Sequence, residues 1–199
     1  SDDNAREFDT AFSLTVEASE KFRTVFPDNA ARPYKRAGWS SDGRYLRGVP
    51  EGDRHPTYKS VGLNASIMGN RANIILDDPM DQKSAMSESE QRKAKDYLDA
   101  TLVPRLQPNI GWMIACMTRY HEFDLASHII RLSEQSGDWI YIRTPMIAEP
   151  DDPMGRNVGD LLWAERFNED WIIREKRRMT LGMFNMVHQG NPAGMGGDV

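Results

Sequence analysis

The feature that most constrains this fold is a short apolar run, residues 74–76, which ends in two adjacent carboxylates, Asp77 and Asp78, followed by Pro79. An apolar run that stops abruptly in acids is typical of a buried strand in a parallel sheet. In open α/β sheets, ligands bind at the carboxyl ends of the strands. Because two neighbouring carboxylates repel each other, this strand end requires Mg²⁺, a shared proton or open water.

Strands and helices alternate along the rest of the chain. Residues 112–117 form a second apolar run, and residues 57–63 and 139–144 have the composition of two further short strands. Apolar residues at helical spacing predict helices between and after these runs. Strands that alternate with helices predict parallel βαβ units, and therefore an α/β fold.

Capping residues, prolines and apolar spacing predict the positions of the helices and loops. One helix is predicted to open with a capping box formed by Ser87 and Glu90 and to stop before Pro104. We also predict one helix from the first residues to Pro27, helices over 125–136, 168–179 and 181–188, irregular loops or a short hairpin over 28–56, and a turn at 68–70.

Composition limits the classes of function. Hydrophobic residues make up 39% of the chain, enough for a core, but the net charge of -5 means that nucleic acid would be contacted only locally. The basic segment 174–178 is one local candidate, and a solvated helix face is the alternative. The single cysteine, Cys116, lies in an apolar run and is predicted to be a buried, reduced thiol of a cytosolic protein. No run approaches the roughly 20 apolar residues of a membrane span.

Two pairs of residues carry the predicted chemistry. Asp77 and Asp78 have the arrangement of nucleotide hydrolases in which one acid holds Mg²⁺ and the next orients the attacking water. The alternative is an ordinary Asp-Asp-Pro turn. Thr118 and Arg119 follow the second apolar run, where polar groups can sense a phosphate on the neighbouring strand end. Here the alternative is that Thr118 caps the strand and Arg119 is a surface residue.

The order of several segments adds a resemblance. Residues 71–79, 118–126, 139–149 and 162–167, followed by residues 186–192 near the end, resemble the large subunit of the tailed-phage terminase. These segments follow the family's order and spacing and span nearly the whole chain. The final segment is close to the Tyr-Gln-Gln-x-Pro ending of the family's ATPase region.

The resemblance implies a P-loop NTPase-like α/β fold, with a parallel sheet flanked by helices and a small helical lid. Residues 1–145 would form part of the ATPase core, residues 146–189 the lid, and residues 190–199 a linker toward a nuclease domain. The implied activity is ATP hydrolysis, with Mg²⁺ and ATP, that drives double-stranded DNA into a procapsid. The implied partners are the portal protein, the small terminase subunit and further copies in a homo-oligomeric ring, in the host cytoplasm at the procapsid portal.

The resemblance also assigns roles to single residues. Asp77 corresponds to the Walker B ligand of Mg²⁺, and Asp78 to the catalytic carboxylate. Thr118 is expected at the nucleotide, in the coupling motif. Arg71 and Arg119 are candidates to reach a phosphate, in the same subunit or from the next one in a ring, and a salt bridge is the alternative for each.

The sequence also departs from the family. It has no Gly-x-x-x-x-Gly-Lys-Ser/Thr phosphate loop and no carboxylate set of a nuclease domain, so we expect the second half of an ATPase domain, incomplete at its N-terminus, which alone hydrolyses ATP inefficiently. Two alternatives stay open. One is a non-catalytic assembly module, a defective remnant of the motor. The other is a metal-dependent nuclease in which Glu122 and Asp124 join Asp77 and Asp78.

Overall fold

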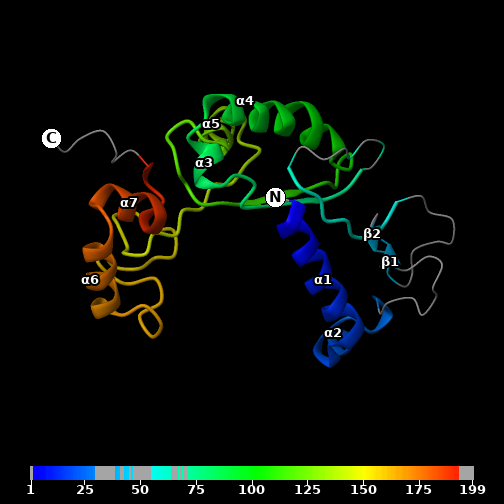
Figure 1. Cartoon of the computed structure of the whole chain (residues 1–199), viewed down its shortest axis with the longest axis horizontal. Helices are drawn as coiled ribbons and strands as arrows, with labels where there is room; N and C mark the ends of the chain where they lie inside the picture. The colour runs from blue at the N-terminus through cyan, green and yellow to red at the C-terminus, as the bar shows by residue number, and fades with distance from the viewer. Residues whose placement is uncertain are drawn as a thin grey trace. The chain divides into compact units, whose positions relative to one another are not determined.

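The chain forms two compact units, Ser1–Arg71 and Ala72–Val199, shown in Figure 1. The computed structural model describes residues 2–29, 39–40, 43–44, 46, 55–63, 67, 69 and 71–192. Of the predicted segments, Met68 and Asn70 of the turn and residues 193–199 of the linker lie outside these ranges, as does most of the predicted loop over 28–56.

The N-terminal unit begins with two helices where the sequence predicts one. Helix α1 (Asp2–Ala18) is followed directly by α2 (Glu20–Val25) and a 3₁₀ turn, η1 (Pro27–Asn29). The break occurs at Ser19, whose hydroxyl accepts a hydrogen bond from the Phe22 amide at 3.1 Å. A serine that caps a new helix in this way competes with continuation of the first one.

A short antiparallel hairpin follows. It is one of the two structures predicted for residues 28–56, the other being irregular loops. Strand β1 (Trp39–Ser40) pairs with β2 (Gly43–Arg44). The strand predicted over 57–63 is wrong, because only Tyr58 forms a bridge, to Arg44. A single bridge does not make a ladder, and the segment is held by its side chain instead, because the Tyr58 ring stacks on Phe12 with centroids 3.9 Å apart.

The C-terminal unit contains the two strands that the apolar runs predict. Strand β3 (Ile74–Asp77) and strand β4 (Met113–Cys116) pair in parallel, with Asp77 opposite Cys116. Parallel strands need a crossover connection. Here it contains α3 (Gln82–Ala85), α4 (Glu88–Tyr97), a π-helical turn η2 (Leu98–Leu102) and a 3₁₀ turn η3 (Val103–Arg105). The unit is therefore an α/β arrangement with a two-stranded parallel sheet.

Helices cover one face of this sheet. Figure 1 shows α4 and α5 (Leu125–Ser136) on the same side of the strands, and the two helices contact each other. Leu76 of β3 is buried, and so are Leu98 and Leu125 on the helical side. Burial of apolar side chains between helices and one face of a sheet stabilises a layered unit of this kind.

The opposite sheet face is exposed, which corrects the prediction of a buried strand. We call it the open face and define it by Ile75, Asp77, Ile114 and Cys116, all of which are exposed. Side chains alternate between the faces of a strand, so each apolar run sends every second residue to this face. The prediction that Cys116 is buried is wrong for the same reason.

The capping box predicted for α4 is also wrong. Ser87 occupies the N-cap without a side-chain hydrogen bond to the backbone, and its hydroxyl lies 3.0 Å from that of Ser89. Glu90 instead pairs with Lys93 one turn on, at 2.8 Å. The helix stops before Pro104 as predicted, because α4 ends at Tyr97. Pro104 lies in the separate turn η3, since proline is tolerated in the first turn of a helix.

The third strand predicted in this unit, over 139–144, does not form. Its residues pair with no strand in the described part of the chain, and Ile140 and Ile142 are 88% and 65% exposed. A strand needs a neighbour for its backbone hydrogen bonds, and this segment has the composition of a strand without that neighbour.

Residues 146–192 pack around their own small core, and we call them the lid after the segment that the resemblance predicts here. Its two predicted helices are confirmed as α6 (Glu169–Arg178) and α7 (Leu181–Gln189). Asn168 and Thr180 cap them by accepting hydrogen bonds from backbone amides three residues on. The core is formed by Met146, Ile172 and Phe184.

A buried glutamine ties the end of α7 to the start of the lid. The Gln189 side chain accepts from the Ile147 amide at 2.8 Å and donates to the Ile147 carbonyl at 3.0 Å. Its amide nitrogen also donates to Glu149 at 2.9 Å, and Glu149 forms an ion pair with Arg143. The Gln189 side-chain amide thus forms with the Ile147 backbone the two hydrogen bonds that a neighbouring strand would otherwise form.

Candidate functional site

Asp77 and Asp78 end β3 in different environments. The Asp77 carboxylate is exposed and makes no hydrogen bond or ion pair with the described residues. Asp78 continues the ladder, because its amide donates to the Cys116 carbonyl at 2.9 Å. Its φ of 38° places it in the left-handed region, which non-glycine residues seldom adopt. The chain therefore turns sharply between the two acids and Pro79.

The ends of the two strands are linked through the second acid. Oδ1 of Asp78 accepts a hydrogen bond from the Thr118 amide at 2.9 Å. Thr118 thus contacts Asp78 through its backbone, a contact that no residue pattern in the sequence predicted. The other oxygen of Asp78 has no partner among the described residues, and it can accept a proton or a hydrogen bond from a bound molecule.

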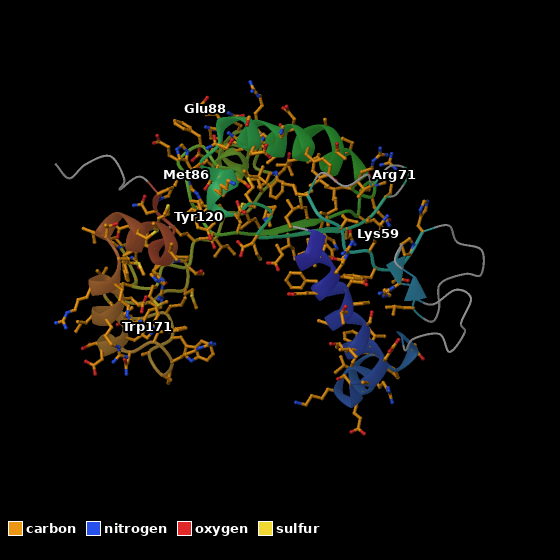
Figure 2. All side chains as sticks on the ribbon, in the orientation of Figure 1. Lys59, Arg71, Met86, Glu88, Tyr120 and Trp171 are labelled. Atoms are coloured by element: carbon orange, nitrogen blue, oxygen red, sulfur yellow. The ribbon has the colours of Figure 1, made fainter. Side chains whose placement is uncertain are left out.

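The loop after β4 folds around Asp124, which is only 3% exposed. Oδ2 of Asp124 accepts hydrogen bonds from the amides of Tyr120 and His121 at 3.1 and 3.2 Å. Oδ1 accepts from the Ser127 amide at 2.9 Å, which caps α5. Figure 2 shows Tyr120 in this loop, at the end of the strands where Met86 also lies.

Arg119 is held by the same carboxylate. Its Nε lies 3.4 Å from both oxygens of Asp124, and one terminal nitrogen donates to the Ser127 hydroxyl at 2.6 Å. Only 16% of the Arg119 side chain is exposed. The salt bridge that was the alternative for Arg119 is therefore present, and its contact with a phosphate stays a prediction.

Arg71, the other arginine predicted at a phosphate, is exposed and is the last residue of the N-terminal unit. Its predicted role stays a prediction.

Two residues of α4 also hold the loop, and sequence reasoning missed both. Gln91 is buried; its side chain donates to the Ala85 carbonyl at 2.6 Å and lies 3.3 Å from Nδ1 of His121. Lys95 donates to the Phe123 carbonyl at 2.6 Å, and burial lowers its pKa, with nearby Arg131 acting in the same direction. Gln91 and Lys95 are four residues apart and therefore lie on the same side of α4, beside its apolar stripe. That spacing is the sequence pattern from which both could have been predicted.

The donor set limits which ion could bind here. Among the described residues, no group of three or more His, Cys, Asp and Glu side chains gathers in a way that could hold a metal. Mg²⁺ does not require such a group, because it keeps several waters and often takes only one or two carboxylates besides substrate phosphates. The exposed Asp77 carboxylate and the unpartnered oxygen of Asp78 fit that requirement.

A scan against protein-family models finds no match for this chain, and a search of curated proteins finds none either. In the described part of the chain, no helix combines the length and the apolar composition needed to cross a bilayer.

Proposed function

We propose that this chain provides the Mg²⁺-nucleotide acids, the coupling loop and the lid of an ATPase that packages double-stranded DNA, as in a terminase large subunit. The proposal includes the P-loop NTPase-like fold, with residues 1–145 as part of the core, residues 146–189 as the lid and residues 190–199 as a linker. It also includes the portal protein, the small terminase subunit and a homo-oligomeric ring as partners, at the procapsid portal in the host cytoplasm.

The observation that carries the proposal is the hydrogen bond between the Thr118 amide and Asp78. It joins two segments that resemble separate motifs of the family, 40 residues apart in the chain, at the carboxyl ends of two paired parallel strands. That edge is where α/β sheets bind ligands. An ordinary Asp-Asp-Pro turn does not need a donor from the neighbouring strand.

The residues have distinct roles in this proposal. Asp77, exposed and unpartnered, would hold Mg²⁺, which when bound supplies positive charge to the phosphates. Asp78, fixed at Oδ1 by the Thr118 amide, has its second oxygen free to orient the attacking water and take up its proton. Arg71 and Arg119 remain candidates to neutralise phosphate charge, Arg119 only after leaving Asp124.

The two alternatives are favoured less by the geometry. A two-metal nuclease needs further carboxylates that converge on the ions. Asp124 already accepts hydrogen bonds at both oxygens, and Glu122 is exposed in a turn. No observation favours a non-catalytic assembly module, but it predicts a stable fold without nucleotide binding, and one experiment separates it from the proposal.

That experiment is an NMR titration with Mn²⁺-ATP, in which the paramagnetic ion stands in for Mg²⁺ and reveals weak binding. We expect millimolar affinity, because the sequence has no phosphate loop. The amide signals of Asp77, Asp78 and Thr118 should broaden first. Asp77→Ala should abolish this local broadening, because it removes the proposed ligand.

The matched control is Asp138→Asn, which removes an exposed carboxylate beyond the opposite end of α5. It should leave the broadening pattern unchanged. Broadening spread evenly over acidic surface residues, or unchanged in Asp77→Ala, would contradict the proposal and favour the assembly module.

A further inference from the structure

We propose that Asp124 is the positioning residue of the candidate site, holding the Thr118 amide against Asp78. The inference rests on the proposed function for its chemistry, but its geometry stands on the contacts of the loop after β4. We call Asp124, Arg119 and Ser127, together with the amides of Tyr120 and His121, the Asp124 cluster.

The two oxygens of Asp124 serve different elements. Oδ1 faces α5, where it accepts from the Ser127 amide at 2.9 Å and from the Ser127 hydroxyl at 3.0 Å. Oδ2 faces the loop, where it accepts from the amides of Tyr120 and His121. One buried carboxylate therefore fastens the loop to the first turn of the helix.

Thr118 lies at the start of this loop, one residue before Arg119. Its amide donates to Asp78 where the chain leaves β4, and the Asp124 cluster fixes the chain from the next residue onward. Arg119 strengthens that restraint, because its side chain bridges Asp124 and Ser127 across the loop. Charge-assisted hydrogen bonds of this kind are stronger than neutral ones. The position of the Asp78 carboxylate is thus set by a residue that does not touch it.

A single substitution separates the two halves of this arrangement. In Asp124→Asn the amide oxygen can keep the helix cap, since asparagine is a good N-cap residue. The amide nitrogen must then face the donors of Tyr120 and His121, and it cannot accept from them. The cap should survive while the loop is released.

The measurement is amide hydrogen exchange of the whole chain, followed by NMR. In Asp124→Asn we expect the Thr118 amide to lose its protection, while the Ser127 amide and the Leu76 amide of β3 keep theirs. Equal losses at all three amides would reduce Asp124 to a merely structural role, and retained protection at Thr118 would overturn the proposal.

The lid offers a matched control. Asp152 is a second aspartate with an unexposed side chain, paired with an arginine, Arg156, at 2.6 Å, and it also accepts from nearby backbone amides. Asp152→Asn should change exchange in the lid and leave the Thr118 amide protected. If it unprotects Thr118 as well, the effect of Asp124→Asn is not local, and the proposal fails.

Two further arms keep the test decisive. If Asp124→Asn does not fold, Ser127→Ala removes only the hydroxyl between Asp124 and Arg119, and it should still speed exchange at Thr118. In the Mn²⁺-ATP titration, Asp124→Asn should weaken the broadening at Asp78 while Asp152→Asn does not. Absence of broadening in the unaltered chain would defeat the proposed function, whereas the exchange data would still decide the role of Asp124.

Discussion

At the scale of single residues, the second acid of the strand end is constrained by its backbone as well as by its charge. Asp78 has a φ of 38° and precedes a proline, and both features restrict which side chains fit. Aspartate and asparagine are the non-glycine residues that tolerate the left-handed region best. The geometry and the chemistry of this position can therefore be separated by substitution.

Asp78→Asn should leave the free energy of unfolding nearly unchanged and weaken the binding of Mn²⁺-ATP. The amide oxygen can still accept from Thr118, and asparagine keeps the same backbone preference. The lost charge should reduce Mn²⁺-ATP broadening at Asp77. Urea unfolding and the titration check the two halves of this prediction, and a large loss of stability would count against it.

Asp78→Glu should behave in the opposite way. Glutamate keeps the charge but is poorly suited to positive φ, so we expect a loss of about 1 kcal/mol in the free energy of unfolding. The same urea experiment measures it. An unchanged stability would mean that the strand end relaxes to an ordinary backbone conformation.

Some site residues could be predicted from the sequence and others could not. The apolar runs before Asp77 and Thr118 predict two strand ends at one sheet edge, and their parallel pairing is observed. For Arg119 the sequence left both a phosphate contact and a salt bridge open, because sequence spacing does not reveal which way a loop folds back. The structure shows the salt bridge, with Asp124. Gln91 was missed because a buried glutamine resembles any polar helix residue.

At the scale of elements, helix ends show how local chemistry sets boundaries. Helix α5 begins at the Asp124 cap and ends at Gly137, whose φ of 71° lies in the left-handed region. The end was predicted from residue type, because glycine strongly prefers the position after a helix. The Asp124 cap was not predicted. The Ser87 capping box failed because Glu90 had a competing partner in Lys93.

Gly137→Ala should lower the free energy of unfolding by about 1 kcal/mol. A β-carbon at this position would meet no atom within 4 Å, so the cost is one of backbone conformation alone. Gly137→Asn should lose less, because asparagine tolerates this conformation. Urea unfolding compares the two, and an equal loss for both variants would point to a different cause.

The lid should lose stability as the pH falls below about 6.5, which is the usual pKa of a histidine side chain. Burial lowers the pKa of His188, whose ring packs against Trp171 and Phe184. The unfolded chain therefore takes up a proton that the folded lid resists, and stability falls until the pH is below the folded-state pKa. Hydrogen exchange of α7 between pH 7 and 5 measures this, and His188→Leu should remove the pH dependence.

The lid should lose further stability at a lower pH, where Glu149 becomes protonated. Hydrogen bonds from Arg143, and to a lesser extent from Gln189, hold the pKa of Glu149 below its usual value, against the opposing effect of burial. A depressed acid pKa stabilises the folded state above the unfolded value of about 4.5, and this stabilisation is lost as the pH falls through the folded pKa. Glu149→Gln should abolish this lower transition and leave that of His188 unchanged.

At the scale of the whole molecule, the open face is the main departure from what the sequence predicts. Purely parallel sheets are usually covered on both faces, and an apolar run gives no sign that one face is bare. The segment 139–144 failed as a strand for a related reason, because composition records a preference for extended backbone and not the presence of a neighbouring strand.

The open face predicts unequal effects for adjacent residues. Leu76 is 8% exposed and Ile75 is 64% exposed. Leu76→Ala should lower the free energy of unfolding by about 2–5 kcal/mol through lost burial and a cavity, whereas Ile75→Thr should change it by less than about 0.5 kcal/mol. Urea unfolding of both variants tests this. Comparable losses would mean that Ile75 is covered in solution.

The position of Cys116 has a consequence for the redox state of the strand end. Its exposed thiol sits directly opposite Asp77 in the strand register. Oxidation of an exposed cysteine to a sulfinic acid is irreversible for most proteins and places a permanent anion at the sulfur. A chain whose Cys116 has been oxidised to this stage by peroxide would therefore have three acids where the reduced chain has two, and it would bind cations at this edge in a different way.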